Sequence, residues 1–135
     1  MKLYSFRLTP GMDLKHELEA FATKEKLNAA FVITCVGSLT VAAIRFAGKP
    51  ETASVAGPLE ITSLTGTFSV EGSHFHITVA DETGKAIGGH LKEGSIVRTT
   101  AELVIGTHDE VRYLREKDPV SGYMELSVEE VRSEK

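Results

Sequence analysis

The chain has 135 residues and a formal net charge of −4 at pH 7, with 41% apolar and 25% charged residues. This is the size of one domain and the composition of a globular protein, which excludes a largely disordered chain. The acidic balance opposes nucleic-acid binding unless the fold gathers a basic patch, and the basic residues are scattered along the sequence. No apolar run reaches the roughly 20 residues that cross a bilayer.

Cysteine usage bears on the cellular compartment. Cys35 is the single cysteine, so an internal disulfide is excluded. The first residues alternate like a strand instead of forming a secretory leader. These two observations predict a reducing, cytoplasmic location.

The N-terminal part predicts one strand and one helix. Residues 3–8 alternate between apolar and polar side chains, which favours a strand. Asp13 follows a turn and is a good helix N-cap, because its carboxylate can accept hydrogen bonds from free amides of the first turn. Apolar residues at helical spacing then predict an amphipathic helix over residues 14–26.

The remainder of the chain predicts strands and turns. Residues 30–36 are nearly all apolar, so we expect a strand buried on both faces that ends at Gly37. A loop is expected over residues 48–58. Further strands are predicted over residues 41–46, 59–70, 74–80, 85–91, 96–105, 111–115 and 123–128. We therefore predict a single α+β domain over residues 1–135, with a large curved or barrel-like sheet and a polar tail over about residues 128–135.

Three histidines form the candidate site. Residues 74–80 alternate, so that His74 and His76 lie on one face of a strand while the apolar side chains lie on the other. His90 follows after one hairpin, which returns its strand beside the first, and the preceding glycines leave room around its imidazole. Three neutral imidazoles suit zinc or a similar divalent metal and leave a fourth position for water or a ligand. The alternative is that the imidazoles only cover a solvated sheet face.

Four other residues have both a functional and a structural interpretation. Glu60 is a candidate metal ligand or general base, or a structural carboxylate. Arg45 and Arg98 could hold a substrate carboxylate, or form surface ion pairs. Cys35 lies in an apolar strand, which favours an inert core thiol. The glycines match no phosphate-binding or dinucleotide-binding pattern.

Several segments together resemble the PPC (plant and prokaryote conserved) domain. The resemblance rests on residues 57–68 (GPLEITSLTGTF), on residues 35–39 (CVGSL), and on residues 74–91 with Gly94. The helix that follows Asp13 fits as well, so nearly the whole chain is covered.

The resemblance implies a mainly antiparallel α+β fold, a homotrimer, and the three-histidine metal site that prokaryotic members commonly keep. Plant members carry AT-hook segments that bind A·T-rich DNA, and this chain has no Arg-Gly-Arg-Pro core of that kind. It also has Gly57-Pro58-Leu59 where plant members have Gly-Arg-Phe. The fold is similar as well to that of acetolactate decarboxylase, a zinc enzyme with a His-x-His pair and a later histidine.

The sequence favours the first of three functions and leaves the other two as alternatives. The first is a DNA-associated or regulatory homotrimer that carries a zinc site. The second is a zinc-dependent lyase or hydrolase that acts on a small carboxylic acid, since zinc can acidify a bound water or polarise a carbonyl. The third is a trimer in which the metal only holds strands together.

Overall fold

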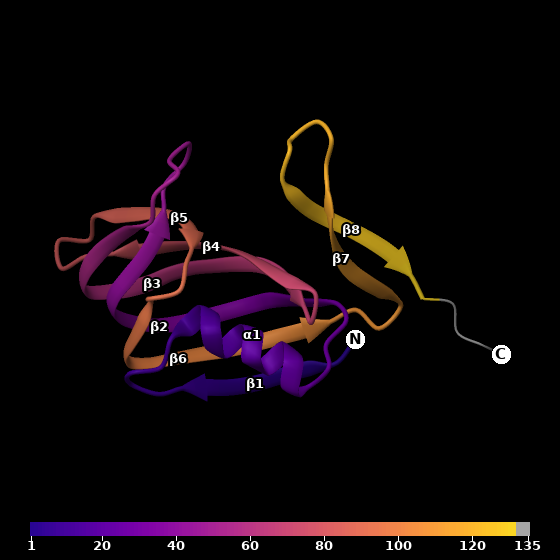
Figure 1. Cartoon of the computed structure of the whole chain (residues 1–135). Helices are drawn as coiled ribbons and strands as arrows, with labels where there is room; N and C mark the ends of the chain where they lie inside the picture. The colour runs from indigo at the N-terminus through magenta and orange to yellow at the C-terminus, as the bar shows by residue number, and fades with distance from the viewer. Residues whose placement is uncertain (132–135) are drawn as a thin grey trace.

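The computed structural model describes residues 1–131 and has the predicted α+β architecture, with one helix and a large antiparallel sheet in that range (Figure 1). The strands and the helix are close to those expected from the sequence. In chain order they are β1 (Leu3–Leu8), α1 (Leu14–Lys24), β2 (Ala30–Arg45), β3 (Ala53–Ser69), β4 (Gly72–Ala80), β5 (Ala86–Leu91), β6 (Ile96–Thr107), β7 (Val111–Lys117) and β8 (Met124–Glu130).

The main sheet has the strand order β1-β6-β2-β3-β4-β5, and all its pairings are antiparallel. Strand β5 pairs a second time, with the end of β2, where Ile44 faces Leu91 and Arg45 faces His90. Four strands therefore form a closed circuit at one end of the sheet, which accounts for the predicted curvature. Strands β1 and β6 extend the sheet beyond this circuit.

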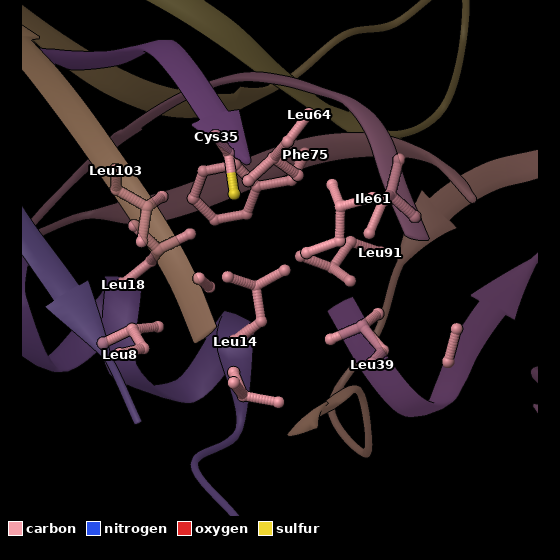
Figure 2. Packing of buried hydrophobic residues seen from close by; sticks show 14 of the residues in the cluster. Leu8, Leu14, Leu18, Cys35, Leu39, Ile61, Leu64, Phe75, Leu91 and Leu103 are labelled. Carbon is pink, nitrogen blue, oxygen red and sulfur yellow. The ribbon is translucent and has the colours of Figure 1, made fainter. Parts of the chain in front are cut away.

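The core lies between α1 and the concave face of the sheet. Leu14 and Leu18 of the helix are fully buried, and Figure 2 shows them facing Leu39, Ile61 and Phe75 of the strands. A buried Leu or Phe side chain contributes about 1.5–3 kcal/mol relative to an exposed one. The packing of these side chains therefore holds α1 against the sheet. The face under the helix is buried, and the opposite face is exposed.

Both ends of α1 have a local cause. Asp13 is the N-cap, as expected, and its Oδ1 accepts a hydrogen bond from the His16 amide at 2.9 Å. The helix ends at Lys24, two residues earlier than predicted, because Lys26 adopts a positive φ of 54°. The amide of Leu27 then donates to the Ala22 carbonyl at 2.9 Å, which closes the last turn.

Strand β2 differs from the prediction in length and burial. It continues through Gly37 to Arg45. At Gly37 the backbone of β6 lies so close that a Cβ would collide with the Thr100 carbonyl and lie 2.8 Å from Ala101 Cα. The glycine thus permits close backbone approach within the sheet and makes no turn. The expectation of burial on both faces was wrong as well, since Ile33 is 47% exposed and Val36 is 57% exposed.

Two further predictions need correction. The expected loop over residues 48–58 is shorter, because residues 53–56 already pair with β2. Strands β7 and β8 do not join the main sheet but form a separate two-stranded arm that projects from it (Figure 1). Residues 128–130 of the expected tail belong to β8, and residues 132–135 lie outside the described part of the chain.

Within residues 1–131, no helix has the length and apolar character that crossing a membrane requires.

The Asp13 carboxylate gives a test of how α1 is held. Its second oxygen, Oδ2, accepts a hydrogen bond from the Gly94 amide at 2.6 Å, so one side chain joins the helix start to the β5–β6 connection. We expect Asp13→Ala to lower the free energy of unfolding by about 2 kcal/mol, through loss of the cap and of this bond. Chemical denaturation measures the change. Asp13→Asn keeps one cap oxygen and should lose less, so equal losses in the two variants would contradict this account.

Candidate metal centre

Side chains along β4 alternate between the buried core and the exposed face that carries the candidate site. Phe75, Ile77 and Val79 are buried in the core, whereas His74 and His76 are exposed on the opposite face. The predicted assignment of the two faces is confirmed. The histidine pair therefore points away from α1, onto the convex side of the closed circuit.

Strand β5 brings the third histidine into place. Its register pairs His90 directly with His76. Two glycines precede His90 and permit the close contacts that the position requires. A Cβ at Gly88 would collide with the Ile77 carbonyl of β4, and a Cβ at Gly89 would lie 2.5 Å from the Arg45 carbonyl of β2. The glycines therefore make room for neighbouring backbones, and not for the imidazole as the sequence suggested.

The three imidazoles form one compact cluster. Their ring centroids are 4.9 Å apart for His74 and His76, 5.1 Å for His74 and His90, and 4.5 Å for His76 and His90. One ligand nitrogen from each ring can be chosen so that all three lie within 4.8 Å of one another. Ligand nitrogens in a tetrahedral zinc site with Zn–N bonds of about 2.0–2.1 Å lie about 3.3 Å apart, a spacing that small side-chain rotations can reach.

The chemistry of the donor set fits a divalent metal. Partial loss of solvent around the ring, followed by the charges of His76 and Arg115, lowers the pKa of His74 below its usual value of 6.5. Burial, followed by the charge of Arg45, lowers the pKa of His90 in the same way. A lowered pKa keeps an imidazole neutral near pH 7, and the neutral form is the one that coordinates a metal.

A cleft of about 730 Å³ opens beside the cluster. Arg45, Lys49 and Pro50 line one side of it, at the end of β2 and in the connection to β3. His74 and His90 form part of its wall, and the turn end of the projecting arm, with Tyr123 just before β8 and Glu125 at its beginning, lines another part. A smaller hollow of about 160 Å³ lies on the other side of His74 and His76, against Thr65 and Thr67 of β3.

The fold brings together only some of the candidate residues. Arg45 lies beside the histidines, whereas Arg98 is exposed on β6 and does not line the cleft. Glu60 is exposed and pairs with Ala80, four residues from His76 along β4, which is about 13 Å of strand. It is not part of the histidine cluster, and its role as ligand or base stays a prediction. Cys35 is buried in the core, and burial raises the pKa of its thiol to about 12, as an inert thiol requires.

Sequence reasoning missed the residues that the arm brings to the site. Arg115 Nη2 of β7 donates to Thr67 Oγ1 at 3.1 Å, and Thr67 is the register neighbour of His74. Tyr123 and Glu125 line the cleft through the same arm. No local motif marks any of these residues, because their position depends on where the arm leaves the main sheet.

The lowered pKa values predict how the metal-free chain depends on pH. Below pH 6.5 the unfolded chain takes up protons on His74 and His90 before the folded chain does. Stability that is present above pH 6.5 should therefore be lost as the pH falls. Melting temperatures of chelator-treated protein between pH 7.5 and pH 5.5 would show this loss. It should be smaller in the double variant His74→Gln, His90→Gln and unchanged in the control His16→Gln. Equal losses in all three proteins would rule out the explanation.

Comparison with known proteins identifies relatives by sequence. The family model of the Plants and Prokaryotes Conserved (PCC) domain matches residues 1–109. A protein from Synechococcus sp. named bifunctional protein GlmU is 44% identical over 131 residues, which are 97% of this chain and 21% of that protein. The chain thus spans about a fifth of the length of the curated relatives it matches.

Solved structures share the fold. A hypothetical protein from Salmonella cholerae-suis has a TM-score of 0.94 and 41% identity, over 96% of this chain and 94% of that one. A metal-containing protein from Archaeoglobus fulgidus has a TM-score of 0.76 and 27% identity, over 94% of each chain. A protein from Ralstonia eutropha, provisionally named as DNA-binding, has a TM-score of 0.77 and 27% identity, over 92% of this chain and 90% of that one. By the family model and by these likenesses, the chain belongs to the Plants and Prokaryotes Conserved (PCC) domain family.

Proposed function

We propose that this protein binds one divalent metal ion, zinc, on His74, His76 and His90. The proposal rests above all on the cluster of three imidazoles whose ligand nitrogens lie within 4.8 Å of one another. It is supported by the metal-containing relative from Archaeoglobus fulgidus. Three nitrogen ligands of intermediate softness favour zinc over magnesium or calcium, which prefer oxygen.

The proposed site is of the open kind. Three protein ligands leave a fourth tetrahedral position, and the cleft beside His74 and His90 offers space for a water or a ligand there. A closed structural site would instead use four protein side chains. The open position makes a purely structural role for the metal the weaker candidate.

Zinc binding is tested by removing one ligand at a time. We expect His76→Ala and His90→Ala each to lower the zinc affinity by at least about 100-fold, because two imidazoles hold the ion much less strongly than three. His108→Ala is the matched control, since His108 lies outside the cluster. Metal analysis should find one zinc per wild-type chain, and competition with a chromophoric chelator measures the affinities. A wild-type chain that retains no zinc would overturn the proposal.

A zinc-dependent enzyme acting on a small carboxylic acid, as lyase or hydrolase, is the first functional candidate for the open site. Zinc would supply Lewis acidity toward a carbonyl or a bound water. The chain's own contribution would be Arg45 and Lys49 in the cleft, whose charges can hold a carboxylate. The fold-level resemblance to acetolactate decarboxylase that the sequence suggests would suit the same class of reaction.

A DNA-associated or regulatory role is the second candidate. Its support is the provisional DNA-binding name of the Ralstonia eutropha relative. The net charge of −4 acts against it, because phosphate contacts require local positive charge. A cytoplasmic location suits both candidates and stays a prediction.

Mobility shifts separate the two candidates. We expect the zinc-loaded protein to shift neither A·T-rich nor random duplex DNA at about 0.1 M salt, where long-range attraction between exposed charges is screened. A discrete complex with the A·T-rich duplex alone at that salt would favour the DNA-associated role. Repeating the assay with Arg45→Gln would show whether the cationic cleft takes part.

We further propose that the chain forms the homotrimer implied by the family resemblance. The exposed face of the sheet carries an apolar patch, in which Leu3 pairs with Gly106 and the side chains of Phe31 and Ile33 lie over that glycine. Leu3 is 55% exposed and Ile33 is 47% exposed. Exposed apolar groups that adjoin one another mark association surfaces.

The trimer has a direct test. Light scattering coupled to size exclusion should give three times the chain mass of 14.6 kDa. Ile33→Asp should lower this mass to that of one chain, because association would bury an unpaired carboxylate. Val120→Asp, at an exposed position outside the patch, should leave the mass unchanged. A wild-type protein of one chain mass would refute the trimer.

A further inference from the structure

The cleft beside the histidines is larger than a metal ion and its water need. Its volume of about 730 Å³ lies within the range of about 300–1,000 Å³ typical of small-molecule sites. His74 and His90 occupy only one part of the wall. The remaining wall is therefore available to recognise the rest of a bound molecule.

One side of the cleft carries two cations that have no ionic partner in the described part of the chain. Arg45 Nη1 donates to the Lys49 carbonyl at 3.3 Å. This bond ties the guanidinium to the β2–β3 connection and uses only one of its three nitrogens. Within residues 1–131, ion pairs join only Met1 to Asp109 and Lys15 to Glu19, so neither Arg45 nor Lys49 has a carboxylate partner. Two unpaired cations in a concave site favour an oxyanion as the ligand group.

The pairing of β2 with β5 places Arg45 beside the histidine cluster. Arg45 is the β2 neighbour of His90, and Gly89 permits that close pairing. An oxyanion held by Arg45 would therefore lie beside the imidazoles.

The projecting arm supplies the opposite side of the cleft. Arg115 binds Thr67 Oγ1, the Ser69 hydroxyl donates to the Tyr113 carbonyl at 2.8 Å, and the Tyr113 amide donates to the Asn28 carbonyl at 2.8 Å. These bonds hold β7 against the main sheet. Among the described residues that line the cleft, Glu125 is the one acidic residue. The arm lies beyond residue 109, where the match to the family model ends.

We propose that the cleft binds a small molecule through a terminal carboxylate or phosphate, with Arg45 and Lys49 as anion-binding residues and the arm as the wall that limits its size and charge. The part of the molecule that faces the histidines rests on the proposed zinc site, whereas the anion-binding part does not. Glu125 opposes the anion electrostatically, so its carboxylate selects against ligands with negative charge along their whole length.

Calorimetric titration with glycolate and with inorganic phosphate tests the proposal and distinguishes the two oxyanion classes. Each probe is titrated into zinc-loaded protein and into chelator-treated protein. We expect one probe to bind, and Arg45→Gln to weaken its binding by about 10-fold or more, the size expected for loss of a charge-assisted hydrogen bond. Lys49→Gln should weaken binding in the same direction. Arg98→Gln removes the same charge outside the cleft and should change the affinity less than about twofold.

The sign of the Glu125 effect is the sharpest part of the test. Glu125→Gln should strengthen oxyanion binding by a few-fold, about what removal of one nearby repulsive charge produces. A residue that only supported the fold would weaken binding when changed. If Arg45→Gln failed to fold, as judged by its melting transition, Lys49→Gln and Glu125→Gln would still decide the question by their opposite signs.

Failure of this inference differs from failure of the zinc proposal. Zinc binding without binding of either probe at millimolar concentration would overturn the anion site alone. Equal effects of Arg45→Gln and Arg98→Gln would overturn it as well. Probe binding that depends on Arg45 in a protein without affinity for zinc would support the anion site and overturn the metal site.

Discussion

Strand β5 pairs with both β4 and β2, and the histidine site depends on this double pairing. Backbones can approach so closely only where no Cβ intervenes, and Gly88 and Gly89 meet that condition against the carbonyls of Ile77 and Arg45. Closure of the circuit sets His90 opposite His76 and beside Arg45 at once. Both the proposed metal ligands and the proposed anion-binding residue therefore follow from one constraint on the backbone.

Within residues 1–131 a single helix covers the sheet, so one face of the sheet is buried in the core and the other is exposed. Alternation along β4 sends Phe75 and Ile77 into the core and sends His74 and His76 to the convex face. The convex face can carry polar chemistry in one region and apolar residues for association in another, because no helix of residues 1–131 covers it. The hydrophobic core and the proposed sites thus lie on opposite sides of the same strands.

The cleft combines residues from inside and outside the segment that the family model matches. The histidines and Arg45 lie in the segment that the family model matches, whereas Tyr123 and Glu125 belong to the arm beyond it. Hydrogen bonds from Arg115 and Tyr113 hold β7 against the main sheet. Such a division would allow ligand preference to change in the arm while the metal ligands remain in place.

The sequence by itself determined the features that depend on local periodicity. The α1 face, the Asp13 cap, the alternation around His74 and His76, and the return of His90 all follow from short-range spacing. Only the tertiary structure decided what the glycines do, because Gly37 and Gly89 meet backbones distant in sequence, and spacing cannot distinguish a close contact from a turn. The partial exposure of β2 and the contribution of Glu125 to the cleft were likewise settled by tertiary structure, since both depend on which elements cover or adjoin a strand.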